Sequence, residues 1–382
     1  METIENTKTH KELQAEVANN GEDDRVVSNE NYSSTLEVAK HICNDYGEAV
    51  YDFLLQYIDL SNATNLLLDT TTTRFNLIKE TMDGFRTIVN LKRINDIRYV
   101  NKFFEAVNLK LSLGGTYIGC VETKDLRKKR VLGKYPIGIN YIVYSMDFVV
   151  KRVLPKLRLT RKLYFFLTRG QNRVMTRAET LGRLISCGFE IKEEKDIDGR
   201  LYVVVEKVGE PKFPEDPTYG ALVRLKRVGK DGKLINVYKL RTMHPYAEYL
   251  QDYVYKQNEL QEGGKFKDDF RISTLGKIFR KLWLDELPMI MNFLKGEMKL
   301  VGVRPLSRHY YSLYTEELQQ KRIQYKPGLV PPFYADMPET LEEIMASEMK
   351  YLEAYEKSPF VTDWRYFWMA FNNIVFKKAR SA

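Results

Sequence analysis

The 382-residue sequence contains no run of about 18 or more consecutive apolar residues, so we expect no conventional membrane-spanning helix. The N-terminus lacks both the basic region and the apolar core of a secretory signal, so we expect no such signal. Only 3 cysteines are present, and their wide spacing fits neither a disulfide framework nor a zinc site. A reducing compartment, most simply the cytoplasm, is therefore favoured.

Low-complexity tracts and internal repeats are also lacking. The sequence is 44% hydrophobic, 12% aromatic and 29% charged, which excludes wholesale disorder and fibrous repeats. A chain of this length is expected to form about two domains with a sizeable core.

The net charge differs between the first 48 residues, which are acidic, and the rest of the chain, which is strongly basic. Residues 1–48 carry 4 basic and 11 acidic residues, a net charge of −7, so the remainder carries +16 of the overall +9. A body this basic favours an anionic partner such as phosphates, nucleic acid or an anionic membrane surface. The alternative, left open by charge alone, is that it only keeps the protein soluble.

Changes in composition divide the chain into four parts. We predict a disordered acidic tail over residues 1–34 and a degenerate Rossmann-like α/β domain over 35–208. A linker with three prolines follows at 209–219, and a second domain at 220–382.

The first domain alternates strands and helices. Apolar runs at 65–69, 86–90 and 116–121 predict strands, and 102–111 predicts a helix that ends at Gly114-Gly115. A second unit follows, with a helix over 177–186 that begins after Thr176, and a hairpin that turns at Asp198-Gly199.

Residues 62–206 resemble the C-terminal half of a class I methyltransferase through the helix–Leu113-Gly114-Gly115–strand step. That family binds its cofactor at a glycine-rich loop after its first strand. No such loop is possible here, because the only earlier glycines are Gly21, Gly47 and Gly84. We therefore expect a non-catalytic scaffold or docking module.

Five ordered motifs mark the second domain: Gly220–Met243, Asp269–Gly276, Phe279–Pro288, Asn292–Pro305, and Arg322 with Lys326-Pro327-Gly328. With them, the domain resembles the bacterial sugar transferase family, the monotopic phosphoglycosyl transferases that start glycan assembly on a polyprenol phosphate. The resemblance implies a mainly helical α+β fold with a small β-hairpin.

Two adjacent carboxylates, Asp285 and Glu286, stand before Leu287-Pro288, where Asp285 is expected to cap a helix. A carboxylate that attacks a diphosphate needs cations around it, because two anions repel. Adjacent carboxylates also suit Mg²⁺. A purely structural capping role is the alternative for this pair.

The resemblance implies a two-step displacement. Asp285 would attack the β-phosphate of a UDP-sugar and release UMP, and a polyprenyl phosphate would then accept the sugar phosphate. Mg²⁺ would be held by Glu286 with Asp285. The expected phosphate-binding residues are Lys239, Arg241, Arg271, Arg280, Arg304 and Arg322. For Lys239 and Arg241, hairpin packing or a salt bridge is an equal alternative.

The family's apolar helix before the hairpin is replaced here by the α/β domain and linker. We expect peripheral binding to the cytoplasmic face of the bacterial inner membrane. The aromatic and basic segment Trp364–Arg380 is a candidate contact, a core helix being the alternative.

The competing hypothesis is a non-catalytic scaffold or regulator of the same polysaccharide pathway. A nucleic-acid-binding protein follows only from the charge and is not supported by any motif, so we expect no nucleic-acid partner. The sugar, the lipid acceptor and the oligomeric state are not defined by the sequence.

Overall fold

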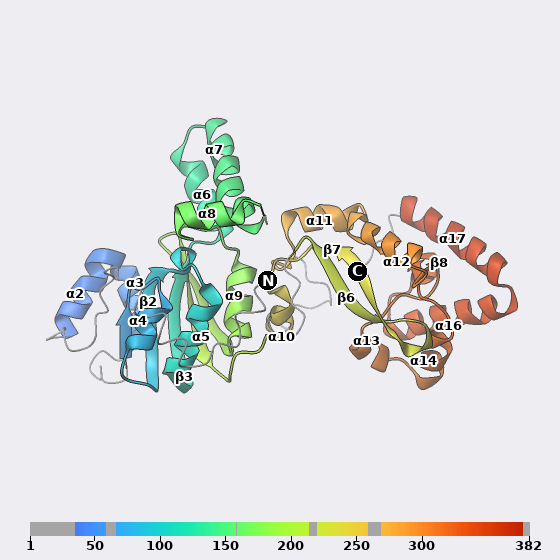
Figure 1. Cartoon of the computed structure of the whole chain (residues 1–382), viewed down its shortest axis with the longest axis horizontal. Coiled ribbons are helices and arrows are strands. Elements are labelled where there is room, and N and C mark those ends of the chain that lie inside the picture. The colour runs from blue at the N-terminus through green and yellow to red at the C-terminus, as the bar shows by residue number, and fades with distance from the viewer. Residues whose placement is uncertain (1–34, 59–65, 158, 214–219, 259–268, 377–382) are drawn as a thin grey trace. The chain divides into compact units, whose positions relative to one another are not determined.

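The computed structural model describes residues 35–58, 66–157, 159–213, 220–258 and 269–376 (Figure 1). The predicted acidic tail at 1–34 lies outside the described residues. The chain divides into two compact units. Unit 1 comprises Met1–Pro214 and Pro245–Phe270, and unit 2 comprises Glu215–His244 and Arg271–Ala382.

Unit 1 is built on a five-stranded sheet of order β1-β2-β3-β5-β4. The strands are β1 (Leu66–Asp69), β2 (Phe85–Arg93), β3 (Leu111–Val121), β4 (Phe189–Ile197) and β5 (Arg200–Lys207). Strands β1, β2 and β3 are parallel, and β5 runs antiparallel to both β3 and β4. This mostly parallel sheet confirms the predicted Rossmann-like α/β class.

Helices cover both faces of the sheet. One core contains Phe53 of α3 with Ile118 of β3, and the other contains Phe104 of α5, Leu181 of α9 and Tyr117 of β3. Alternate residues of β3 therefore point into different cores. Outside residues 124–169, the helices of unit 1 are α2 (Thr35–Tyr46), α3 (Glu48–Leu55), α4 (Arg74–Lys79), α5 (Val100–Lys110), α9 (Arg177–Ser186) and α10 (Gln251–Asn258), with short turns η4 (Ile94–Asp96) and η8 (Ala247–Leu250).

The predicted end of α5 at Gly114-Gly115 is wrong. The helix ends at Lys110, and β3 runs through both glycines. The pairing of β2 with β3 shifts register here, with Phe85 opposite Leu111 but Thr87 opposite Thr116. Gly114 has φ 77°, and a Cβ on Gly115 would lie 2.8 Å from a backbone oxygen. The glycines thus form a strand irregularity that other residues could not adopt.

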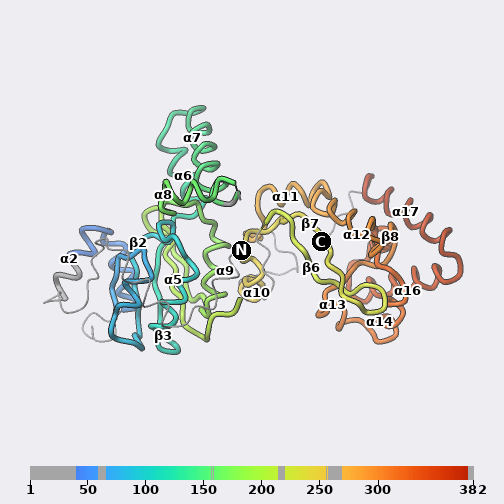
Figure 2. The backbone as a smooth tube through the Cα atoms, viewed as in Figure 1, coloured from blue at the N-terminus to red at the C-terminus, as the bar shows by residue number. Residues whose placement is uncertain are grey.

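Three further helices stand away from one end of this sheet, as Figures 1 and 2 show for α6, α7 and α8. They are α6 (Lys124–Lys134), α7 (Ile139–Phe148) and α8 (Arg161–Thr168), with the short turns η5 (Val149–Val153) and η6 (Leu154–Lys156) between α7 and α8. We call residues 124–169 the helical lobe.

Residues 245–270 were assigned to the second domain by the sequence analysis, but they belong to unit 1. The reason lies on α9. A Cβ on Gly182 would lie 2.2 Å from the carbonyl oxygen of Tyr246, so only glycine admits this approach. The Arg183 guanidinium lies 4.4 Å from the centre of the Tyr246 ring.

Unit 2 combines one hairpin with many short helices, as expected. The hairpin is β6 (Leu222–Val228) with β7 (Leu234–Leu240), joined by η7 (Lys230–Gly232). A second small sheet pairs β8 (Lys299–Val301) with β9 (Gly328–Val330) in parallel. The helices are α11 (Thr274–Lys281), η9 (Leu284–Met289), α12 (Ile290–Leu294), α13 (Arg308–Ser312), α14 (Glu316–Ile323), α15 (Phe333–Asp336), α16 (Leu341–Lys357) and α17 (Pro359–Val375).

Of the helices in the described ranges, none combines the length and the apolar character needed to cross a membrane.

Candidate functional site

The acidic pair lies on a short 3₁₀ helix, η9, that packs against the hairpin strand β7. The predicted capping role of Asp285 is wrong. Trp283 precedes the helix with φ 61°, and Asp285 and Glu286 lie in its first turn. Trp283 adopts this conformation while its ring packs 4.4 Å from the ring of Tyr334. The carboxylates are therefore displayed by the first turn rather than used to cap it.

Lys239 of β7 contacts the pair directly. Its Nζ lies 2.6 Å from Oε1 of Glu286. Burial raises the pKa of Asp285, and the negative charge of Glu286 raises it further, while Lys239 and Arg280 act in the opposite direction. The site thus holds two carboxylates and two cations that interact electrostatically. Burial and the neighbouring carboxylate outweigh the two cations, so the net effect is a raised pKa for Asp285.

Arg280 is placed by α11, whose N-terminus is capped by Ser273. Its Nε donates to Oγ1 of Thr242 at 3.0 Å. Gly276 on the same helix has no room for a side chain, because a Cβ would lie 2.0 Å from the carbonyl oxygen of Thr242. This close approach holds α11, and with it Arg280, against the end of the hairpin.

Arg241 and Arg271, two of the predicted phosphate-binding residues, both form hydrogen bonds within the protein backbone network. Nε of Arg241 donates to the carbonyl oxygen of Gly220 at 2.9 Å and so closes the base of the hairpin. Arg271 is buried, and its carbonyl oxygen accepts from the amide of His244 at 2.8 Å. The contacts of Arg241 agree with the hairpin-packing alternative left open above.

Arg304 has a cationic neighbour that sequence reasoning missed. Burial lowers the pKa of Arg227, and the positive charge of Arg304 lowers it further. Arg304 also lies 5.7 Å from the centre of the Phe333 ring. Cations whose charges repel each other offer a favourable position for a phosphate group. Strand alternation could have indicated Arg227, because it shares a face of the hairpin with Lys239.

Aromatic rings connect the acidic pair with this second cationic group. Trp283, next to η9, packs on Tyr334, and the Tyr334 ring lies 4.0 Å from that of Phe333, over which Arg304 lies. The spacing of the two groups is therefore set by packed side chains rather than by flexible loops.

Arg322 lies behind Arg304 rather than with the acidic pair. It is buried on α14, forms an ion pair with the buried Glu348, and donates from Nη2 to the carbonyl oxygen of Arg304 at 2.5 Å. Burial lowers the pKa of Arg322 to about 10. These contacts indicate that Arg322 positions the backbone of Arg304.

Asn292, the first residue of the predicted motif Asn292–Pro305, attaches α12 to the hairpin. Its side chain is fully buried, accepts from the amide of Tyr238 at 3.1 Å, and donates to the carbonyl oxygen of Asn236 at 2.7 Å. Nδ2 also donates to Oε2 of Glu297 at 2.6 Å. A side chain satisfied at three points holds α12, which follows directly after the η9 helix of the acidic pair, in a fixed register on β7.

Within the described residues, no group of three or more His, Cys, Asp and Glu side chains is arranged to hold a metal ion. Asp285 and Glu286 are the adjacent carboxylates available at this site. Mg²⁺ commonly takes one or two protein carboxylates and completes its shell with phosphates and water. The donor set therefore fits a Mg²⁺ ion that arrives with a phosphate-bearing substrate.

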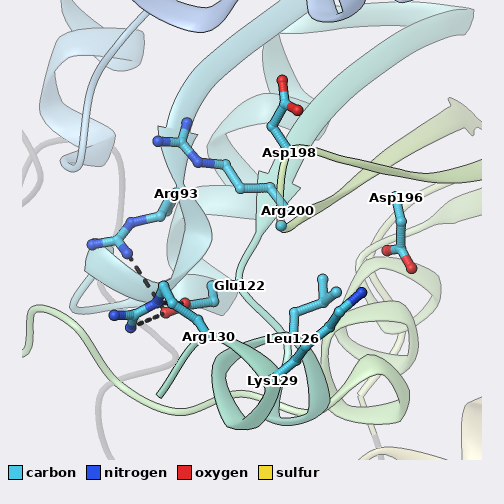
Figure 3. Close-up of a pocket in the computed structure, with 9 residues that line it drawn as sticks. Arg93, Glu122, Leu126, Lys129, Arg130, Asp196, Asp198 and Arg200 are labelled. Atoms are coloured by element: carbon cyan, nitrogen blue, oxygen red, sulfur yellow. Dashed lines mark hydrogen bonds and ion pairs between the residues drawn. The ribbon is translucent and has the colours of Figure 1, made fainter. Parts of the chain in front are cut away.

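Unit 1 contains a separate cavity of 620 Å³ at the carboxyl ends of β2, β3 and β4 and the start of β5 (Figure 3). Glu122 in its wall pairs with Arg93 and Arg130, as the dashed lines show. The remaining lining residues are Leu126, Lys129, Asp196, Asp198, Gly199 and Arg200. The carboxylates and cations of this wall approximately balance, so the cavity carries no strong preference for one sign of charge.

Unit 2 thus carries an acidic pair on a short helix, with Lys239 in contact with Glu286 and with Lys239 and Arg280 both acting electrostatically on Asp285. Residues 215–377 match the family model of the bacterial sugar transferases. The predicted resemblance is thus confirmed.

Curated proteins that are similar in sequence to this chain are also named as sugar transferases. The galactosyl transferase CpsE of Streptococcus agalactiae serotype III (strain NEM316) is 40% identical over 111 residues, which cover 28% of this chain and 24% of the relative. The undecaprenyl-phosphate galactose phosphotransferase of Salmonella typhimurium is 37% identical over 109 residues, which cover 27% and 23%. The chain therefore spans about a quarter of the length of these relatives.

Among solved structures, an S-adenosylmethionine-dependent methyltransferase from Mesorhizobium loti is 18% identical. The similarity covers 37% of this chain and 79% of that chain, with a TM-score of 0.23. The fold of unit 1 is defined by its own strand order.

Proposed function

We propose that this chain transfers a sugar 1-phosphate from a UDP-sugar to a polyprenyl phosphate, and so starts the assembly of a surface polysaccharide. The observation that carries the proposal is the Asp285–Glu286 pair beside Lys239 and Arg280, within the part of the chain that matches the bacterial sugar transferases. Relatives named for transfer to undecaprenyl phosphate support the choice of acceptor.

The reaction proceeds in two displacements at one phosphorus atom. A carboxylate oxygen of Asp285 attacks the β-phosphorus of the UDP-sugar, the bond to the bridging oxygen of the diphosphate breaks, and UMP leaves. A phosphate oxygen of the lipid then attacks the same phosphorus, the bond to Asp285 breaks, and the carboxylate is regenerated. The product is a polyprenyl diphosphate sugar, and no oxidant or reductant is needed.

The residues around the pair have separate tasks. Lys239 and Arg280 offset the negative charge that would repel an incoming diphosphate. Glu286, with Asp285, would hold Mg²⁺, which neutralises phosphate charge when it is bound. Arg304 and Arg227 offer a second phosphate position.

The test is UMP release from a panel of UDP-sugars with Mg²⁺, with and without undecaprenyl phosphate in detergent. Asp285→Asn is the variant, and Asp231→Asn is the matched control, because Asp231 lies exposed in the hairpin turn. The proposal is supported if the wild type and Asp231→Asn release UMP in a lipid-dependent way and Asp285→Asn does not.

A second readout isolates the first displacement. Without lipid, the wild type should release at most one UMP per chain and gain one sugar phosphate on the peptide that contains Asp285, as seen by mass spectrometry. A folded wild type that releases no UMP from any donor would overturn the proposal in favour of a non-catalytic scaffold.

A further inference from the structure

The helical lobe has the reverse of an ordinary core arrangement. Its buried side chains include Arg127, Asn140 and Arg152 as well as Val131 and Tyr164, while many of its apolar side chains are exposed. The exposed apolar residues of the lobe are Tyr135, Ile137, Ile139, Tyr141, Ile142, Met146, Val149, Val150, Leu157, Leu159, Leu163, Phe166 and Leu167. Ile137 is 94% exposed and Phe166 is 82% exposed. Exposed apolar side chains gathered on a few neighbouring short helices mark a candidate site of interaction.

The arrangement is fixed by charged contacts inside the lobe. Arg127 of α6 is 2% exposed, and it binds Asp147 of α7 through two hydrogen bonds, at 2.6 and 2.7 Å. Arg152 is anchored to the sheet unit by an ion pair with Glu179 of α9. Breaking a buried ion pair is costly, so α7 is held with Asp147 inward. Its apolar stripe at Ile142 and Met146 must therefore face outward.

The net charge of the helical lobe indicates which kind of partner this surface binds. Residues 124–169 carry 13 Lys and Arg and two Asp, a net charge of +11, which is most of the +16 carried by the chain beyond residue 48. On the lobe surface, Lys134, Arg161 and Lys162 are exposed together with the apolar side chains. Basic residues next to exposed aliphatic and aromatic side chains favour an anionic lipid surface.

We propose that the helical lobe docks unit 1 on an anionic membrane surface, with the apolar side chains of α7 and α8 in the headgroup region and the basic side chains at the lipid phosphates. The helices lie along the surface, since each has 11 residues or fewer. The contact concerns unit 1 and does not depend on transfer by unit 2.

The experiment is flotation of the full chain with phosphatidylcholine vesicles that contain, or lack, about a third of phosphatidylglycerol. We expect binding only to the anionic vesicles, weakened by high salt. Ile142→Asp and Phe166→Asp should each weaken binding at least tenfold, because an apolar anchor becomes an anion. Leu113→Asp is the matched control, since Leu113 is 76% exposed on β3, outside the lobe.

A second set of variants separates charge from apolar contact. Lys134→Gln, Arg161→Gln and Lys162→Gln should each cost roughly fivefold in affinity for anionic vesicles. Circular dichroism and thermal unfolding should match the wild type, because the three side chains are exposed.

Three results would overturn the proposal: a wild type that ignores anionic vesicles, lobe variants that bind as well as Leu113→Asp, or a self-associated wild type that Ile142→Asp dissociates. The last would make the surface an interface between copies. No sugar donor is present, so failure here leaves the transferase proposal standing.

Discussion

Nζ of Lys239 lies 2.6 Å from Oε1 of Glu286, which joins strand β7 to the helix that carries the acidic pair. Both side chains are about four-fifths buried, so water screens this ion pair less than an exposed one. The contact places a cation beside two carboxylates and lowers the pKa of Asp285 against the effect of burial. Lys239 therefore acts on both members of the pair.

Replacing this lysine tests that role. Lys239→Gln should reduce UMP release by about a hundredfold, because a positioned charge in a partly buried site is lost. The ionisation of Asp285 should also shift to higher pH, which a pH–rate profile would reveal. Lys233→Gln, in the exposed hairpin turn, is the control. Equal activity of the two variants would assign Lys239 to hairpin packing.

The raised pKa of Asp285 predicts a gain in stability when its charge is removed. The folded chain binds the Asp285 proton more readily than the unfolded chain, so ionising Asp285 costs stability as the pH rises through its folded pKa. Asp285→Asn should therefore abolish turnover while raising the unfolding temperature at pH 7. The difference should vanish at a pH below the unfolded value of about 3.9. Thermal unfolding at several pH values measures this, and a variant less stable than the wild type at pH 7 contradicts it.

The backbone contact between Gly302 and Gly328 predicts a sensitive position far from the acidic pair in sequence. A Cβ on Gly328 would lie 2.1 Å from the amide nitrogen of Gly302, so Gly328→Ala must push β8 and β9 apart. We expect a loss of about 1–3 kcal/mol in the free energy of unfolding. Gly220→Ala, which meets no atom closer than 4.0 Å, should change it little. Urea unfolding compares them, and equal midpoints would contradict the close contact.

Much of the architecture could be predicted because its signals are local. The helix Arg177–Ser186 has a capping threonine, and the hairpin turn has Asp198 and Gly199 at positive φ. The end of α5 could not be predicted, because Gly114 and Gly115 serve strand pairing rather than helix termination. The place of residues 245–270 was also missed, since it depends on contacts with α9 across a long sequence separation.

For the candidate site, too, local motifs could be predicted from the sequence, whereas features that depend on tertiary packing could not. Motif order indicated Asp285, Glu286, Lys239 and Arg280, which the structure brings together. The division of the arginines into exposed and buried ones depends on tertiary packing, so Arg322 was grouped with the phosphate-binding residues. The exposure of the apolar side chains of the lobe could not be predicted from the sequence, because apolar residues normally indicate a buried core.

The buried pair of Arg322 and Glu348 allows that grouping to be tested. Arg322→Met leaves the Glu348 carboxylate buried without its partner, and should cost about 3–5 kcal/mol in the free energy of unfolding. Adding Glu348→Leu removes the second charge, and the double variant should recover most of that loss. Because Arg322 contacts Arg304 through the backbone carbonyl oxygen of Arg304, the refolded double variant should keep a KM for the UDP-sugar within a fewfold of the wild type. A double variant that is stable but binds the donor tens of times more weakly would return Arg322 to the phosphate-binding residues, as the sequence alone suggested.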